Sequence, residues 1–406
     1  MTPQPLLPIA PRALLAGARR KESALIALTE ELARLESPTD EPARVAEVLS
    51  LLADKSTALG GRSKLHKLKG SGGALEVHFG PRHRRGAEGR VLLLGHADTV
   101  WPTGTLTTMA LHQAEGKLWG PGVLDMKAGL AMALTAIELL NEAELLNREI
   151  VLLITSDEET GSTTSRPLIE KLAAECSAVY VLEAAQGLAL KTARKGTGNW
   201  RIAVQGIAAH AGVDFDKGAN ALLELARQIE RISSWSDPKT GLTVNVGIAA
   251  GGTKTNVVAA SAWAEIDVRI SRKADGSRIT RRFASLKPFD KRCQLTITGG
   301  INRPPMERTR GTVRLFKQAQ ALGSALGLEL SEASTGGASD GNFTSALGIP
   351  TLDGLGAVGT GAHAPHESLE LKHLAPRTAL LAALLAASHT AGAPVTLATK
   401  PTRSLT

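Results

Sequence analysis

The stretch VLLLGHADTV, residues 91–100, joins an aliphatic run to a histidine and an aspartate. Four successive apolar residues, Val91–Leu94, are typical of a strand that is buried on both faces of a parallel sheet. His96 and Asp98 stand two positions apart, so in extended chain their side chains point to the same side. Ligands of open α/β sheets bind beyond the carboxyl ends of the strands. The stretch therefore predicts an α/β sheet with a functional site where this strand ends.

Further strands and helices alternate on both sides of this stretch, which predicts an α/β fold. Strands separated by helices favour a mostly parallel sheet with helices on both faces. The expected helices are 22–35, 127–141, 312–326 and 376–388, and the expected strands are 150–154, 179–182 and 349–352.

The middle of the chain has the pattern of a smaller α+β domain. Strands are expected at 200–205, 242–246, 262–270 and 294–298, and helices at 219–232 and 277–286. The order strand-helix-strand-strand-helix-strand is that of a ferredoxin-like unit. We therefore expect a catalytic domain in two parts, 1–193 and 306–406, interrupted by an insert at 194–305.

Length and composition indicate a globular protein of more than one domain. The chain has 406 residues, of which 43% are apolar and 21% charged. Its sequence holds no apolar run near the ~20 residues that cross a bilayer, and its amino terminus lacks a signal-peptide core. We therefore expect a cytoplasmic protein without a membrane partner. Cys176 and Cys293 are far apart in sequence, so reduced structural thiols are expected.

The basic charge does not by itself predict a nucleic-acid partner. The net charge is +8 and the pI is near 9.6, with clusters at 19–21, 82–85 and 281–282. A single-strand-binding surface would interleave aromatic side chains with these clusters, and the sequence has none there. We interpret the clusters as solvated surface and expect no nucleic-acid partner.

Acidic and histidine residues recur where strands of the outer domain are expected to end. Each alone has an ordinary interpretation as a surface, turn or helix-capping residue. The carboxyl ends of strands share one crevice, so their joint placement predicts convergence. Asp125 lies in GPGVLDMKAG, Glu158 and Glu159 in TSDEETGS, Glu183 after VYVL, and His363 in GTGAHAPHES.

Two histidines with several carboxylates suit Zn²⁺, although the same ligands accept Co²⁺ or Mn²⁺. A two-metal centre ~3.5–4 Å across uses a carboxylate that spans both ions. Asp125 is the expected bridge. One metal is expected to take His96 and Glu183, and the other Glu159 and His363.

Two further carboxylates have expected roles beside the metals. A metal-bound histidine usually donates its other ring N–H to a carboxylate, and Asp98 is placed to accept it from His96. Glu158 and Glu159 are adjacent and point in different directions. With Glu159 as a ligand, Glu158 is expected to face a water molecule as the general base.

The ordered set GHADTV, GPGVLDMKAG, TSDEETGS, Glu183 and GAHAPHE resembles the di-zinc metallopeptidase family of glutamate carboxypeptidase, acetylornithine deacetylase and succinyl-diaminopimelate desuccinylase. The resemblance extends from about Leu25 to Ala387 and is strongest to the glutamate carboxypeptidase branch. It implies the same seven site residues, with His363 rather than His366 as the last ligand. It also implies a cis peptide beside Asp125 and a homodimer formed through the insert.

The resemblance also implies functional residues in the insert and in a glycine-rich loop. His210 would reach the partner subunit's active site and stabilise the oxyanion. Asn256, Arg269 and, more weakly, Arg303 would hold a substrate carboxylate. Gly337, with Gly336, resembles a loop whose backbone faces the substrate.

The sequence thus predicts a zinc-dependent hydrolase that cleaves an amide bond beside a free carboxylate. Release of a C-terminal residue such as glutamate, from a small folate-type molecule or a short peptide, is the first hypothesis. An N-acyl-amino-acid deacylase is the alternative. A binding protein that keeps the fold without catalysis is a third, and the complete set of seven residues argues against it.

Overall fold

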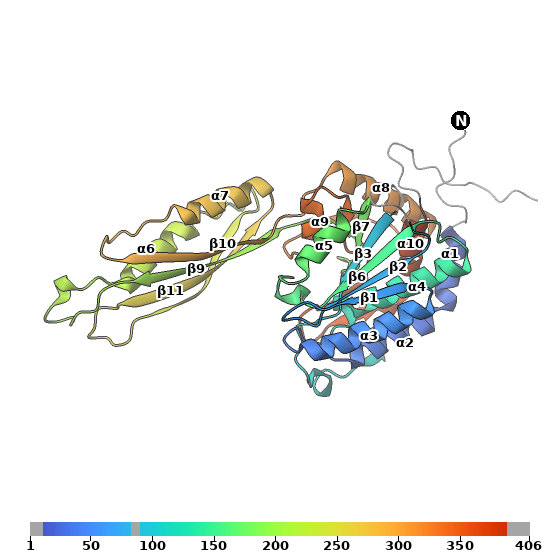
Figure 1. Cartoon of the computed structure of the whole chain (residues 1–406), viewed down its shortest axis with the longest axis horizontal. Helices are drawn as coiled ribbons and strands as arrows, with labels where there is room; N and C mark the ends of the chain where they lie inside the picture. Colours follow the sequence, from blue (N-terminus) through green and yellow to red (C-terminus); the bar gives the residue numbers. More distant parts are fainter. Residues whose placement is uncertain (1–10, 83–89, 388–406) are drawn as a thin grey trace, which may run out of the picture. The chain divides into compact units, whose positions relative to one another are not determined.

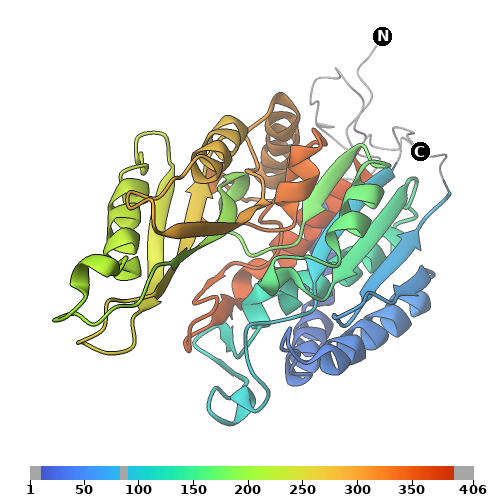
Figure 2. The ribbon, with the colours of Figure 1, turned by 60° about the vertical axis from the view of Figure 1, so that its left-hand side comes forward.

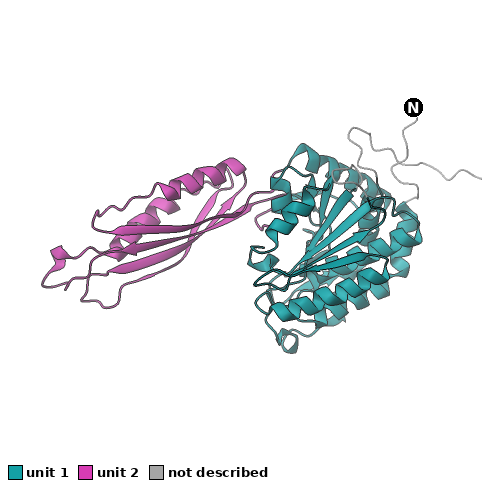
Figure 3. Cartoon of the chain, in the orientation of Figure 1, with its two compact units in different colours: residues 1–192, 308–334, 339–406 teal, residues 193–307, 335–338 magenta. Residues whose placement is uncertain are grey.

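The structure, a computed structural model, describes residues 11–82 and 90–387. Parts of three sequence predictions lie outside the described residues. They are the first ten residues of the amino-terminal segment, the basic cluster 82–85 beyond Arg82, and Ser388, the expected last residue of the final helix. The chain forms two compact units, shown in Figure 3. Unit 1 holds residues 1–192, 308–334 and 339–406, and unit 2 holds 193–307 and 335–338.

Unit 1 is built on a six-stranded sheet (Figure 1). The strands β6, β3, β7 and β14 run parallel, whereas β1 and β2 add an antiparallel hairpin at one edge. The expected α/β sheet is confirmed, and the hairpin is an addition to it. In sheet order the strands are β1 (Arg62–His66), β2 (Ala74–Phe79), β6 (Glu149–Thr155), β3 (Arg90–His96), β7 (Ala178–Val181) and β14 (Thr351–Leu352).

Helices cover both faces of this sheet. In β3, Val91 and Leu93 face one apolar cluster, while Leu92 and Leu94 face another. This alternation explains why all seven residues of the strand are buried. The first face packs on α1 (Pro11–Arg20), α2 (Glu22–Arg34), α3 (Pro42–Ala58), α4 (Ala128–Glu142), α8 (Arg310–Ala325) and α10 (Leu374–Ala386), and the second on α5 (Arg166–Ala173) and α9 (Gly341–Ala346).

A small second sheet brings distant loops of unit 1 together. It joins β15 (Gly359–Thr360), β16 (Ser368–Glu370), β5 (Lys117–Trp119) and β4 (His112–Ala114). The pairing of β16 with β5 places the loop after β15 beside the loop after β5. The first of these loops carries His363, and the second leads to Asp125.

Ionic side chains form a chain across the β1–β2–β6–β3 part of the sheet. The Glu76 carboxylate contacts the Nε2 atoms of His66 and His78, each at 2.6 Å. His78 Nδ1 lies 2.8 Å from Glu149, which also accepts from Arg90 at 2.7 Å. The edge hairpin is therefore joined to the central strands by charges as well as by its backbone.

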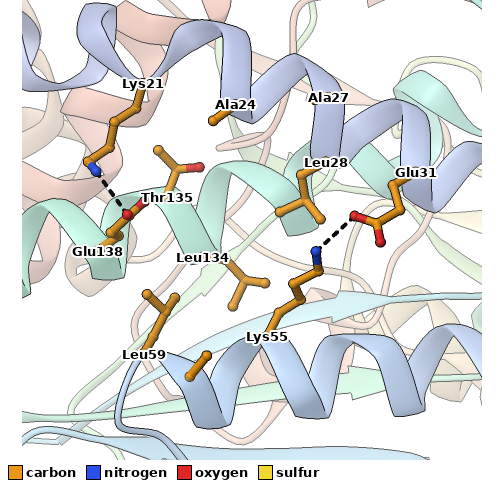
Figure 4. A pocket seen from close by; sticks show the side chains of 11 residues that line it. Lys21, Ala24, Ala27, Leu28, Glu31, Lys55, Leu59, Leu134, Thr135 and Glu138 are labelled. Carbon is orange, nitrogen blue, oxygen red and sulfur yellow. Dashed lines mark hydrogen bonds and ion pairs between the residues drawn. The ribbon is translucent and has the colours of Figure 1, made fainter.

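A hollow of about 380 Å³ opens between α2, α3 and α4 (Figure 4). Its wall is mainly apolar and includes Leu134. Two ion pairs lie at its edge, Lys21 with Glu138 at 2.8 Å and Lys55 with Glu31 at 2.9 Å. Because both lysines are neutralised by glutamates, the hollow has no charge pattern that selects a ligand.

Unit 2 has the expected ferredoxin-like order (Figure 2). Its sheet is antiparallel with the order β10-β11-β9-β12, and one of its faces packs on both helices. Trp200 stacks on Phe283 at 4.5 Å between ring centroids in that core. The elements are β9 (Gly196–Gln205), α6 (Ala221–Ser233), β10 (Thr243–Gly251), β11 (Ser261–Ile270), α7 (Lys273–Ala284) and β12 (Gln294–Arg303).

The chain enters and leaves unit 2 through adjacent segments. Arg194, at the end of β8 (Leu190–Arg194), exchanges two backbone hydrogen bonds with Met306, each of 3.0 Å. β8 also pairs with β13 (Glu332–Thr335), which leads to the segment 335–338. Among the described residues, no helix has the length and apolar character needed to cross a membrane.

Candidate metal centre and active site

His96 is the last residue of β3 and is 1% exposed. Its Nδ1 lies 2.9 Å from the backbone carbonyl of Asp98 and 3.4 Å from the Asp98 carboxylate. The carboxylate was expected to orient the imidazole, but the closer acceptor is the carbonyl oxygen of the same residue. Nε2 is thereby left to point toward the neighbouring carboxylates.

The Asp98 carboxylate is engaged mainly by the turn after β6. It accepts hydrogen bonds from the backbone N–H groups of Glu158 at 3.3 Å and Glu159 at 3.1 Å. Thr39 donates its hydroxyl to the same carboxylate at 2.8 Å. These bonds draw the carboxylate away from His96 and hold the turn Glu158–Thr160 in place. Asp98 therefore contacts both His96 at the end of β3 and the turn Glu158–Thr160 after β6.

Asp125 lies between the two predicted histidine ligands. Its Oδ1 is 3.3 Å from His96 Nε2, and its Oδ2 is 3.3 Å from His363 Nε2. The peptide bond to Met126 is cis, as the resemblance implied. Each oxygen of one carboxylate thus faces a different imidazole, which is the arrangement that a bridging ligand needs.

The two remaining predicted ligands fall on opposite sides of Asp125. Glu183 Oε1 lies 3.5 Å from His96 Nε2, and Glu159 Oε2 lies 3.3 Å from His363 Nε2. Glu158 groups with His96 and Glu183, with ligand atoms within 4.8 Å of one another. The backbone brings all seven predicted outer-domain residues to one place.

Buried atoms of this cluster fit a cation. Within the part of the chain that the structure describes, His96 Nε2, Asp125 Oδ1 and Glu159 Oε1 are buried and make no hydrogen bond. A buried polar atom without a partner is costly, so such atoms are rare unless a ligand or ion completes them. Imidazole nitrogen and carboxylate oxygen are donors that zinc accepts. The residues present therefore fit a metal centre.

The electrostatics of the cluster also favour added positive charge. Burial lowers the pKa of His96, but the close carboxylates of Asp125, Asp98 and Glu183 prevail and hold it well above its usual range. The carboxylates of Asp125 and Glu159 raise the pKa of His363 to about 10. Burial raises the pKa of Glu159. The carboxylates thus make protons bind tightly here, and a metal cation would satisfy the same field.

Three supporting residues near the cluster were not predicted. Lys127 is buried and donates to the carbonyls of Leu32 and Leu35, which ties the start of α4 to the end of α2. Arg377 in α10 binds the carbonyls of Gly354 and Gly356 in the turn after β14. Gly356 N–H in turn bonds to the Glu183 carbonyl at 2.9 Å.

The third is Glu367, whose carboxylate binds backbone amides of the Asp125 loop. Nothing in local sequence reveals this role, because the partners lie 242 to 245 positions away. The GAHAPHE motif does contain the residue, four positions after His363.

His210 and Asn256 are neighbours within unit 2. The N–H of Ala211 donates to the Asn256 carbonyl at 3.0 Å, and His210 forms an isolated bridge with Val257. The His210 Nδ1 accepts from the Gly212 N–H at 3.1 Å. That bond leaves Nε2 as the atom through which His210 could bind a ligand.

Arg269, Arg303 and Gly337 also belong to unit 2. Arg269 in β11 and Arg303 in β12 both lie opposite Thr197 of β9. The Arg269 Nε bonds to Asp267 at 2.9 Å. The carbonyl of Gly337 accepts from Arg194 at 3.2 Å, and a Cβ at Gly337 would have no atom within 4 Å. Glycine is therefore not required there by crowding.

Comparison with known proteins assigns the chain to a class. Residues 92–387 match the pattern of a peptidase family, so the chain is a hydrolase of the metallopeptidase class. The family is peptidase family M20/M25/M40, and this chain belongs to it.

Two curated relatives illustrate the range of activities. Carboxypeptidase G2 of Pseudomonas sp. (strain RS-16) is 28% identical over 402 residues, covering 92% of this chain and 91% of that protein. Succinyl-diaminopimelate desuccinylase of Paraburkholderia xenovorans (strain LB400) is 29% identical over 380 residues, covering 87% and 96%. The predicted family is confirmed, and a carboxypeptidase and a desuccinylase, two of the three enzyme types named in the resemblance, are found among the relatives.

Solved structures share the fold at low sequence identity. Aminopeptidase PepT from Bacillus cereus ATCC 10987 has a TM-score of 0.75 at 23% identity, covering 90% of this chain and 98% of that one. The Bacillus subtilis YXEP protein, described as a dinuclear metal binding peptidase from the M20 family, has a TM-score of 0.66 at 13% identity, covering 91% and 98%. Both likenesses confirm the fold class.

Proposed function

We propose that this protein is a di-zinc hydrolase that cleaves an amide bond next to a free carboxylate. Carboxypeptidase action that releases a C-terminal residue such as glutamate, from folate-type or peptide substrates, is the leading form. The observation that carries the proposal is Asp125, whose two oxygens lie 3.3 Å from two different imidazoles. Cobalt or manganese could replace zinc at the same donors.

The proposed ligands divide into two sets that share Asp125. His96 and Glu183 form one set, and Glu159 and His363 the other. When bound, the two ions would polarise the scissile carbonyl and lower the pKa of the attacking water. The unpartnered buried atoms of His96, Asp125 and Glu159 support this division.

Glu158 is the proposed general base. It is 7% exposed, and its N–H is fixed by Asp98. Its carboxylate would take a proton from the attacking water and deliver it to the leaving nitrogen. Asp98 would hold both the His96 ring and the Glu158–Glu159 backbone, so that base and ligands keep their separation.

Unit 2 supplies the proposed substrate contacts. Arg269, with Arg303 in the same row of the sheet, would bind the substrate carboxylate, and Asn256 would assist. His210 would stabilise the developing oxyanion in the active site of the partner subunit. The Gly337 backbone would line the substrate. Support comes from geometry within unit 2, where His210 and Asn256 lie on adjacent segments.

Homodimerisation through unit 2 is part of the proposal. β10 is an edge strand, and an edge strand offers unpaired backbone groups to a second chain. Ile248 on β10 and Leu223 on α6 are large apolar side chains that are 53% and 52% exposed. Replacing both with glutamate should yield a monomer by light scattering. A double variant that stays dimeric would exclude this surface.

A cytoplasmic location is proposed as well. Cys176 and Cys293 are both buried free thiols, as expected for a protein in a reducing compartment. Measuring the protein in cell fractions would test the location directly.

An N-acyl-amino-acid deacylase is the second candidate, because a desuccinylase is also among the relatives, at 29% identity over 87% of this chain against 28% over 92% for the carboxypeptidase. The deciding experiment assays zinc-loaded protein on N-acyl amino acids, dipeptides and glutamate conjugates of folate type, before and after chelation. Turnover of glutamate conjugates or peptides supports the carboxypeptidase. Turnover of simple N-acyl substrates alone supports the deacylase, and turnover that survives complete metal removal contradicts both.

A further inference from the structure

The Glu367 carboxylate lies in the loop that carries His363. This loop, residues 361–367, connects β15 to β16, and Glu367 is fully buried. His363 itself has a side chain that is 51% exposed and a positive φ of 63°. The packing of its own side chain therefore does little to fix its position. The contacts that hold this loop in place are therefore those of its buried end, at Glu367.

Four N–H groups converge on Glu367. Its Oε1 accepts from the backbone of Leu124 at 2.9 Å and of Asp125 at 3.0 Å. Its Oε2 accepts from Gly122 N–H at 3.0 Å and from the indole N–H of Trp101 at 2.7 Å. A carboxylate has about four lone-pair sites, so its accepting capacity is filled. Hydrogen bonds to a charged acceptor are shorter and stronger than neutral ones.

We infer that Glu367 is a positioning residue that sets the separation between Asp125 and His363 and so controls the binding of one of the two metal ions. This inference rests on the proposed function. Glu367 is the last residue of the loop that carries His363, and its carboxylate accepts a hydrogen bond from the Asp125 N–H. One carboxylate therefore links the loop of His363 to the loop of Asp125. Because four N–H groups occupy its carboxylate, Glu367 is not itself a proposed metal ligand or substrate contact. Its effect passes entirely through the two ligands.

The geometry predicts which ion is affected. His363 and Glu159 form the set on one side of Asp125. Glu367 anchors the backbone of Asp125, which both sets share, but among the four other ligands it anchors only His363, through the loop that they have in common. The other set, His96 and Glu183, follows directly after parallel strands and does not depend on that loop. Loss of Glu367 should therefore weaken one ion selectively, whereas general loosening of the fold would weaken both.

A neutral amide cannot replace the carboxylate. Glu367→Gln presents an NH₂ group to one pair of N–H donors, which leaves these donors without an acceptor and sets donor against donor. Groups that orient metal ligands typically change metal affinity 10–100-fold when altered. We expect the weaker-bound ion of Glu367→Gln to dissociate about 10–100-fold more readily than in the wild type.

The test titrates metal-free, folded protein with zinc by calorimetry and by chelator competition. Wild type should bind two ions, and Glu367→Gln should bind one ion nearly as the wild type does and the other about 10–100-fold more weakly. Trp101→Phe is the matched control, because it removes only one of four donors, and its effect should be far smaller. In a His363→Ala background, Glu367→Gln should have much less effect on metal affinity than it has in the wild type, as expected for two residues that act mainly on one site.

Activity gives an independent signature. At limiting zinc, kcat of Glu367→Gln should fall, while excess zinc should restore it toward the wild-type value with little change in KM. If Glu367→Gln does not fold, Glu367→Asp provides the test. It keeps the charge but withdraws the oxygens from the amides, and should also weaken one ion selectively.

Three results would contradict the inference, and each has a different meaning. If a folded Glu367 variant binds both ions as the wild type does, the positioning role is wrong while the proposed function stands. If the wild type itself binds no metal, the proposed function fails and the inference with it. Equal weakening of both ions would also contradict the selective role of Glu367.

Discussion

The Asp98 carboxylate lies 3.1 Å from the backbone nitrogen of Glu159, a residue 61 positions further along the chain. This bond crosses from the end of β3 to the turn after β6, two neighbouring parallel strands. It means that the residue expected to orient one ligand also fixes the backbone of another. Changes at Asp98 should therefore affect both halves of the proposed metal centre.

Asp98→Asn should reduce kcat and weaken both metal ions, by about 10–100-fold in affinity. In the asparagine variant an NH₂ group replaces one of the two accepting oxygens, so only one of the Glu158 and Glu159 N–H groups keeps its acceptor. Zinc titration together with steady-state kinetics measures the effect. Thr39→Val removes only the hydroxyl that donates to Asp98 and serves as the control. Wild-type metal affinity in Asp98→Asn would disprove this dual role.

Glu158→Gln should lower kcat by about 10²–10⁴-fold, the usual contribution of a general base. The substitution is nearly isosteric, and the backbone N–H that bonds to Asp98 is kept. Metal content, measured by elemental analysis, should stay at the wild-type value. A variant that retains turnover would show that another group takes the proton.

Metal removal should lower thermal stability as well as activity. The cluster holds buried unpartnered atoms and several carboxylates, which repel one another without a cation. An ion at 100 times its dissociation constant stabilises the fold by about 2.7 kcal/mol. Differential scanning calorimetry should show a lower Tm after chelation and recovery on adding zinc, but not magnesium. An unchanged Tm would argue against a metal at this cluster.

The Glu76–His78 ion pair should make the free energy of unfolding depend on pH. The hydrogen bond from His78 lowers the pKa of Glu76 from 4.5 to about 2, although burial opposes this. The bond to Glu76 likewise raises the pKa of His78 above 6.5. The Glu76 contribution is lost as pH falls from 4.5 toward 2. The His78 contribution is lost as pH rises through its raised pKa.

The difference in stability between wild type and His78→Gln should therefore be largest between about pH 4.5 and 6.5, on the order of 1 kcal/mol in the free energy of unfolding. Urea unfolding of both metal-free proteins across pH measures it. His112→Gln, at an exposed histidine on β4, should show no such window. A constant difference across pH would contradict the ionic interpretation.

Much of the catalytic unit could be predicted because its signals are local. Aliphatic runs identify β3 and β6, and the Ala/Leu-rich segment identifies α4, since burial on every side demands such residues. Position at or just after a parallel strand was then sufficient to bring His96, Glu159 and Glu183 to one edge. The parallel sheet converts sequence position into spatial proximity.

Other features carried no local signal. β1 and β2 form the edge hairpin and contain Lys64, Glu76 and His78, so their polar residues obscure the strand pattern. Glu76 and His78 are tolerated there because His78 pairs with Glu76 on the same strand and with Glu149 on β6, whereas Lys64 is exposed. Glu367 could be seen within a motif, but its role depends on backbone amides more than 240 positions away. Such contacts follow from the folded topology alone.

The paired backbone bonds between Arg194 and Met306 hold the two ends of the long segment of unit 2 side by side. In a variant that lacks the residues between Arg194 and Met306, a short turn would be enough to reconnect the chain, because these two residues are already hydrogen-bonded to each other. Substitutions within unit 2 can therefore accumulate without moving the strands of unit 1 that carry the proposed metal ligands.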